Sequence, residues 1–173
     1  MTARGHGPHL ADRADIIRWA DRMEARSEFP RLVRNLIRRN NDQLAELEMR
    51  AAEGTGSSGF DGVTRAARAT PFVPEGLAVW ELGVGVTFKD KANSDYAKRC
   101  ADPLGRDPGT TTFVFVTPRH WEDKEGWAIA KKADGIWADV RAFDVDDIDL
   151  ALDLAPAVLA RFSEIVGKPS HGA

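Results

Sequence analysis

The pattern of apolar and polar positions divides the chain into a helical beginning, a strand-rich middle and a second half in which helices and strands alternate. Apolar residues at helical spacing predict one helix over 16–23 and another over 27–39, with Ser27 as the N-cap of the second and Pro30 in its first turn. Strands are then predicted at 47–51, 60–66 and 77–86, the last from the apolar run "LAVWELGVGV".

The second half predicts crossover connections. A helix over 90–101, with Asp90 as its N-cap, leads to the run "TTFVFVTP", which is typical of a central strand buried on both faces. A helix at 120–133, a strand at 136–145 and two helices within 146–168 follow. Strands joined by turns can pair antiparallel, whereas strands joined by helices should be parallel. We therefore expect an α/β (α+β) fold with a mixed central sheet flanked by helices, in one domain at 12–168 between flexible tails at 1–11 and 169–173.

Composition narrows the possible functions. The 173 residues are 43% hydrophobic with a formal net charge of -3, so any surface for nucleic acid must be a local patch. The single cysteine excludes an internal disulfide framework and a multi-cysteine zinc site, and it suits the cytoplasm. The N-terminal residues have no apolar core of a signal peptide, and no window predicts a membrane span.

The candidate chemistry centres on Glu81, a carboxylate in the middle of an apolar strand. Asp61 lies between two glycines at the preceding strand, so the two acids should be close if these strands pair. Two carboxylates on adjacent strands form a hard-oxygen site for Mg²⁺ or Mn²⁺, and a lysine nearby can position a water and stabilise a phosphoryl group. Lys91 and Lys98 follow on one face of the next predicted helix.

A structural explanation is also open. An aspartate between glycines is often only a turn residue. Glu81 could also form a buried ion pair with a cation from the arginine-rich helix predicted over 27–39. The exposed face of that helix is either an ordinary solvated surface or a surface that contacts phosphates. Its arginines are Arg31, Arg34, Arg38 and Arg39.

The order of elements and the Asp…Glu…Lys series resemble the PD-(D/E)xK restriction-endonuclease-like superfamily. Several longer blocks resemble more narrowly the N-terminal nuclease-like domain of large bacterial proteins that continue into an ATPase or sensor region, as in anti-phage defence proteins. These blocks are "GFDG", "PFVPEGLAVWELG", "KANSDYAKR", "TTFVFVTPRHW" and "IWADVRAFDVDDIDLALDLAPAV".

The resemblance implies a Mg²⁺-dependent (or Mn²⁺-dependent) DNA endonuclease domain in which Asp61 and Glu81 bind the metal. Glu28 is the nearest match to the helix-borne glutamate that often adds a ligand. The lysine expected two residues after the glutamate is replaced by Gly83, so either Lys91 or Lys98 substitutes or the site is inactive.

The sequence is therefore compatible with two functions. One is a nuclease acting on DNA, as the effector of a defence system. The other is an inactive nuclease-like module that binds nucleic acid or protein. In either case an ATPase or sensor region, a separate protein or a second copy of the chain is an expected type of partner, and a membrane is not.

Overall fold

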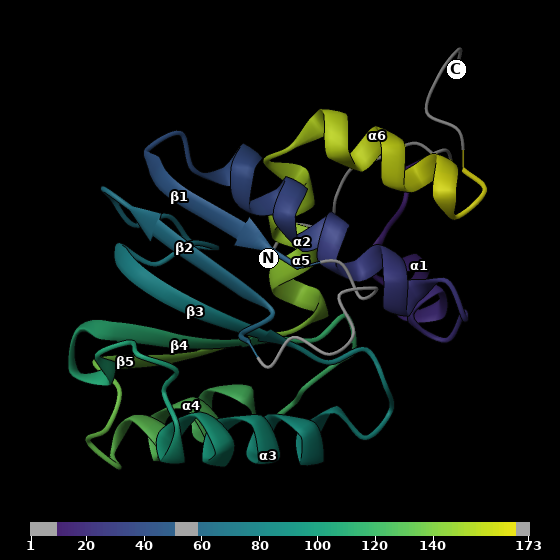
Figure 1. The fold of residues 1–173 in the computed structure, drawn as a ribbon. Coiled ribbons are helices and arrows are strands. Elements are labelled where there is room, and N and C mark those ends of the chain that lie inside the picture. Colours follow the sequence, from purple (N-terminus) through teal and green to yellow (C-terminus); the bar gives the residue numbers. More distant parts are fainter. Residues whose placement is uncertain (1–9, 51–58, 169–173) are drawn as a thin grey trace.

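The computed structural model describes residues 10–50 and 59–168, which form a five-stranded mixed sheet with helices on both faces (Figure 1). The strands lie in chain order, β1 (Leu44–Met49), β2 (Gly62–Ala66), β3 (Gly76–Leu82), β4 (Thr111–Val116) and β5 (Asp139–Phe143). β1, β2 and β3 pair antiparallel, and β3, β4 and β5 pair parallel. The predicted mixed α/β class and the change from turn-linked to helix-linked strands are confirmed.

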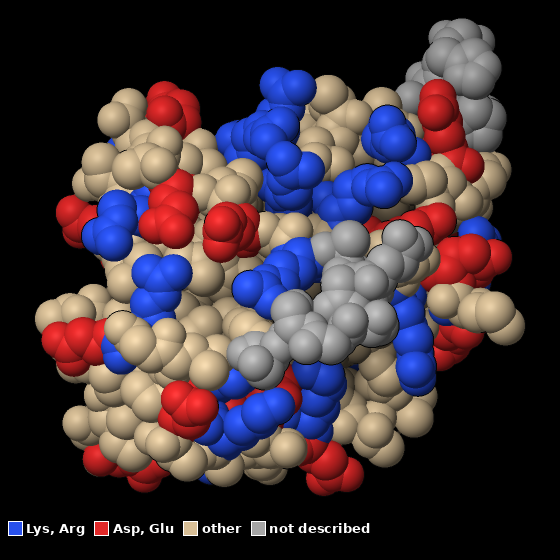
Figure 2. Space-filling model, viewed as in Figure 1, with Lys and Arg blue, Asp and Glu red and all other residues tan. Residues whose placement is uncertain are grey.

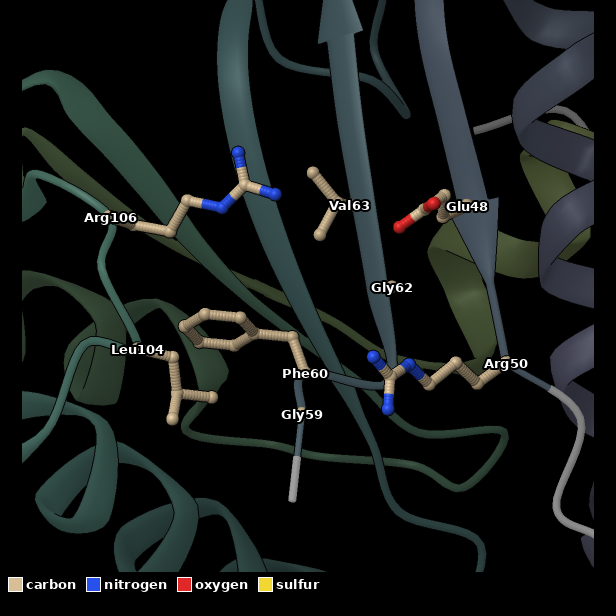
Figure 3. Close-up of a pocket in the computed structure, with 8 residues that line it drawn as sticks. All are labelled: Glu48, Arg50, Gly59, Phe60, Gly62, Val63, Leu104 and Arg106. Carbon is tan, nitrogen blue, oxygen red and sulfur yellow. The ribbon is translucent and has the colours of Figure 1, made fainter. Parts of the chain in front are cut away.

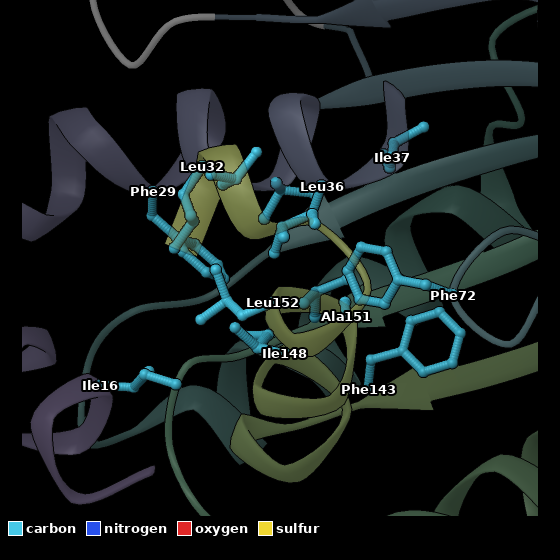
Figure 4. Close-up of a cluster of buried hydrophobic side chains, with 14 of the residues drawn as sticks. Ile16, Phe29, Leu32, Leu36, Ile37, Phe72, Phe143, Ile148, Ala151 and Leu152 are labelled. Carbon is cyan, nitrogen blue, oxygen red and sulfur yellow. The ribbon is translucent and has the colours of Figure 1, made fainter. Parts of the chain in front are cut away.

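Helices of the first and last parts of the chain cover one face of the sheet. They are α1 (Arg13–Ala20), α2 (Ala25–Asn40), α5 (Val145–Asp153) and α6 (Pro156–Ile165). Their apolar residues pack with Trp80, Phe143 and other residues of the strands in the larger core, part of which Figure 4 shows. Phe72, from the loop before β3, stacks on Phe143 in this core at 5.2 Å between ring centroids.

The opposite face carries α3 (Phe88–Ala101) and α4 (Lys124–Lys132), which cross between successive parallel strands. Alternation along β3 separates the two cores, because Ala78, Trp80 and Leu82 face the larger one while Val79 faces the smaller one. All six residues of β4 are buried, as expected for a central strand covered on both faces. Glu81 shares the face of Val79 and therefore points towards α3.

Both N-caps predicted from the sequence are wrong. α2 begins at Ala25 rather than after Ser27, whose hydroxyl donates to the carbonyl of Glu24 instead of accepting from a backbone N–H. α3 begins at Phe88 with Thr87 as N-cap, so Asp90 lies in its first turn, where a negative charge still favours the helix dipole. Each helix begins two residues before the polar residue, which the sequence pattern did not reveal.

The N-terminal boundary of the domain also differs. Ala11, which was expected in a flexible tail, is fully buried, and its N–H donates to Ser163 Oγ of α6 at 2.8 Å. The remainder of the predicted tails, 1–9 and 169–173, lies outside the described residues. Among the residues that are described, no helix is long and apolar enough to cross a membrane.

Candidate functional site

The structure brings Asp61 and Glu81 together at the adjoining ends of two antiparallel strands. Asp61 directly precedes β2, and Glu81 is the last residue but one of β3. The register pairs Gly62 with Trp80, so the next positions along the two chains are Asp61 and Glu81. The Leu82 N–H donates to Asp61 Oδ2 at 2.8 Å and so fixes this carboxyl group against the end of β3. The two carboxyl groups are close enough to interact, since the charge of Asp61 raises the pKa of Glu81.

Glu81 is almost completely buried, with 3% of its surface exposed, and its ionisation is disfavoured. Burial raises the pKa of the Glu81 carboxyl, and the charge of Asp61 raises it further, so that it reaches about 8 against an ordinary 4.5. The hydrogen bond from Arg99 acts in the opposite direction but does not outweigh these two effects. A bound divalent cation would offset the cost of burying a charge at Glu81 and relieve the repulsion from Asp61, so it would favour the ionised carboxyl group.

Arg99 is the buried cation that faces Glu81. Its Nε donates to Glu81 Oε1 at 3.0 Å, and its Nη2 donates to the carbonyl of Gly59 at 3.0 Å. Its guanidinium carbon lies 4.9 Å from the centroid of the Phe60 ring. The ion pair that the sequence left open is therefore present, but the arginine comes from α3 and not from the basic helix α2.

Lys91 covers the position where the expected lysine is missing. A Cβ placed on Gly83 would lie 2.6 Å from Phe115 Cζ and 3.5 Å from Lys91 Cδ. Phe115 therefore occupies the space that a side chain at Gly83 would need, and the stem of Lys91 lies next to it. The Lys91 ammonium forms an ion pair with Asp95 and lies 5.9 Å from the Phe115 ring centroid. Lys91 and Lys98 are both exposed on α3, and Lys91 is the one whose stem lies beside Gly83.

Glu28 does not join this pair. It lies on α2, in the layer on the other face of the sheet, where its Oε2 accepts from Trp19 Nε1 at 3.1 Å. It also lines a cavity of about 190 Å³ whose wall is completed by Phe162 and other residues of α6. The expectation that Glu28 is an additional ligand of the Asp61–Glu81 site is therefore not supported by its position.

Four arginines of α2 are exposed on one side of the helix, as the sequence predicts. Figure 2 shows lysine and arginine side chains gathered over α2 and again over α3, on the same face of the molecule. The arginines are Arg31, Arg34, Arg38 and Arg39.

A second group of potential ligands was not found from the sequence. One atom each of His120, Asp144 and Asp146 lie within 4.8 Å of one another, so this cluster could hold a metal ion. Cations already satisfy the acids, because Lys124 Nζ lies 2.7 Å from Asp144 Oδ1 and Arg13 Nε lies 2.6 Å from Asp146 Oδ1. The feature that could have revealed this cluster is the parallel pairing of β4 and β5, because side chains that follow the carboxyl ends of parallel strands meet at one edge of the sheet.

Asp144 has a structural role that accounts for this cluster without a metal. It is the N-cap of α5 and forms a capping box with Asp147, and it also accepts from the Trp121 N–H at 3.0 Å. Burial alone would raise the pKa of Asp144, but the hydrogen bonds from Lys124 and Trp121 hold it below its ordinary value. The Asp61–Glu81 pair, with a single buried arginine and a raised pKa, is the stronger candidate for a functional centre.

Comparison of the chain with protein-family models, with curated proteins and with solved structures finds no match. The resemblance to PD-(D/E)xK nucleases therefore stays a prediction from the sequence.

Proposed function

We propose that the protein is a metal-dependent DNA endonuclease domain that hydrolyses phosphodiester bonds at Asp61 and Glu81. The observation that carries the proposal is the convergence of the half-buried Asp61 carboxyl group and the buried Glu81 carboxyl group at the adjoining ends of β2 and β3. A mixed sheet flanked by helices, with the aspartate directly before one strand and the glutamate on the next, supports the restriction-endonuclease-like architecture that the sequence resembles.

The residues around the pair fit a hard divalent cation. Asp61 and Glu81 would supply carboxylate oxygens to Mg²⁺ or Mn²⁺, and the ion would polarise a phosphoryl oxygen and lower the pKa of a bound water. Lys91, beside Gly83, is the cation that would hold a water or stabilise charge on the phosphoryl group. Arg99 holds Glu81 in the metal-free protein and neutralises part of the charge that the acids bring into the interior.

The exposed arginines of α2 are proposed to contact DNA phosphates outside the cleavage site. Such contacts carry little sequence information and weaken steeply as the salt concentration rises. The resemblance to nuclease-like domains of defence proteins further suggests that an ATPase or sensor region, or a separate protein, controls this activity.

A second function is favoured by a specific observation, namely that the ion pair with Arg99 already satisfies Glu81 and that Gly83 replaces the expected lysine. On this alternative the fold retains nucleic-acid or protein binding without chemistry. The two alternatives differ in whether the carboxyl pair binds a metal.

Nicking of supercoiled plasmid tests the proposal, with Mg²⁺, Mn²⁺ or EDTA present. We expect metal-dependent nicking that is lost in Glu81→Gln and reduced about 100-fold or more in Lys91→Met. Glu75→Gln, at an exposed position before β3, is the matched control for the acid, and Lys98→Met separates the two lysines. Both of these variants should retain activity.

If no nicking is observed, calorimetric titration with Mn²⁺ shows whether the carboxyl pair still binds a metal. Binding that is present in the wild type and absent in Glu81→Gln would indicate a competent site that needs its partner region. Absence of both nicking and Mn²⁺ binding would refute the nuclease proposal and leave the binding module.

A further inference from the structure

A cleft of about 220 Å³ lies on the sheet next to the Asp61–Glu81 pair, on the same face as α3. Figure 3 shows Arg50 and Arg106 reaching into it from opposite sides, with Glu48 on a third side and Val63 and Phe60 beneath. Arg50 follows β1, and Arg106 lies in the loop between α3 and β4. Two segments far apart in the sequence therefore supply one guanidinium group each to the same small space.

The cleft exists because helices cover only part of this face. α3 and α4 pack over β3, β4 and β5, while the face of β1 and β2 extends beyond them (Figure 1). The register places Glu48 opposite Val63 on this uncovered part of the sheet. Phe60 and Val63 in the floor are each only 6% exposed, so a ligand from solvent would meet the charged rim first.

Glycine at position 59 allows Arg50 to take its place in the cleft. A Cβ on Gly59 would lie 2.6 Å from Arg50 Cζ, so any other residue would displace the guanidinium group. Arg106 lies 4.0 Å from Glu46 Oε1, the outer limit of an ion pair, and so keeps its donors available to a closer anion. Arg50 and Arg106 therefore line the cleft with two guanidinium groups, beside the carboxylate of Glu48, and guanidinium groups are suited to binding phosphate oxygens.

The cleft is joined directly to the candidate metal centre. Phe60 and Gly62, the residues on either side of Asp61, both line it. The carbonyl of Gly59 accepts from Arg99, the same arginine that pairs with Glu81. Since every nucleotide of a strand carries one phosphate, a strand cut at Asp61 and Glu81 can place a neighbouring phosphate in the cleft.

We propose that this cleft is a second phosphate subsite, in which Arg50 and Arg106 bind a phosphodiester next to the one being hydrolysed. The subsite rests on the proposed nuclease function for its purpose, but its binding of a nucleic-acid phosphate does not require a metal. The substrate would then be a nucleic-acid strand that continues beyond the cleaved bond.

Binding of a fluorescein-labelled single-stranded oligonucleotide, measured by anisotropy in EDTA, tests this subsite without relying on cleavage. Arg106→Gln should weaken binding several-fold and reduce the slope of log affinity against log salt by about 1. Glu48→Gln should tighten binding, because it removes the negative charge at the rim. Arg68→Gln is the matched control, since Arg68 is an exposed arginine after β2 that pairs with Asp42 and lies outside the cleft.

Oligonucleotides with and without a 5′-phosphate separate the two sources of the ligand. Equal affinity for both, with the Arg106→Gln effect on each, supports an internal phosphodiester. A preference for the 5′-phosphate that Arg106→Gln removes would overturn that choice in favour of a strand end.

The subsite and the nuclease can fail separately. If Arg106→Gln and Arg68→Gln have the same affinity and salt slope, the subsite is refuted even when plasmid nicking occurs. If nicking never occurs but the Arg106→Gln effect persists, the cleft stands as the phosphate site of an inactive binding module.

Discussion

Replacing Glu81 with glutamine should stabilise the metal-free protein while it abolishes metal binding. The pKa of Glu81 is about 8 in the folded protein and 4.5 ordinarily, so folding favours the protonated carboxyl group. The stability that this provides is fully present below about pH 4.5 and is lost as the pH rises through about 8. Glutamine keeps the shape and the neutral state of protonated Glu81, so the variant should not show this loss.

The expected size follows from the shift. A difference of one pKa unit corresponds to about 1.4 kcal/mol, so the full shift of Glu81 corresponds to about 5 kcal/mol above pH 8 and about 3 kcal/mol near pH 7. We expect the free energy of unfolding of Glu81→Gln to exceed that of the wild type by less than about 1 kcal/mol near pH 5 and by these larger amounts at the higher pH values. At low pH the two proteins should be alike, because Arg99 lacks a charged partner in both of them while Glu81 is protonated. The advantage of the variant grows with pH because only the wild type then has to ionise a buried carboxyl group.

Urea unfolding in EDTA, followed by tryptophan fluorescence from about pH 5 to about pH 9, measures this difference. Glu75→Gln provides the control for removing an exposed carboxylate. If Arg99 instead keeps Glu81 ionised, Glu81→Gln would leave a buried guanidinium group unpaired and would destabilise the protein by about 3–5 kcal/mol at neutral pH. A loss of this kind would refute the reasoning. Addition of Mn²⁺ at the higher pH should stabilise the wild type but not the variant.

Two further substitutions test the surroundings of the candidate sites. Gly83→Ala should lower the free energy of unfolding by about 1–3 kcal/mol, because its methyl group would overlap the buried Phe115 ring, and an unchanged melting temperature would show that the ring moves at no cost. Asp144→Ala should destabilise the protein by at least about 1–2 kcal/mol through loss of the α5 cap. Because the folded pKa of Asp144 is lowered, its contribution should be present above about pH 4 and lost on further acidification, so urea unfolding curves of variant and wild type should converge at low pH.

The strand pattern and the meeting of Asp61 with Glu81 could be predicted because they depend on local signals. The β-branched and aromatic run of β4 has only one stable environment, which is a sheet covered on both faces. The turn before β3 brings its strand back beside β2, and an antiparallel register then places residues near the adjoining ends of the two strands opposite one another.

The identity of the cation beside Glu81 could not be predicted in the same way. Arg99 reaches Glu81 because α3 packs against β3 with a particular rotation, and the helical pattern alone does not fix which arginine faces the sheet. The same holds for His120 and Asp144, which are separated in sequence and meet only because β4 and β5 are neighbours. The N-caps were missed for a different reason, since Ser27 and Asp90 are compatible with both a cap and a first-turn position.

The energetic balance at Glu81 is itself an argument for function. Glu81 faces Arg99 in the interior with the carboxyl group of Asp61 beside it, and replacing buried ionic groups with apolar residues of similar volume is often neutral or stabilising. Val79, two residues earlier on the same face of β3, shows that this environment accepts an ordinary apolar side chain. Packing alone therefore gives no reason for an acid at Glu81, whereas Asp61 also accepts from the Leu82 N–H. A divalent cation would give a reason for the pair, because it requires oxygen ligands at one point and offsets both the burial and the repulsion that raise the pKa of Glu81.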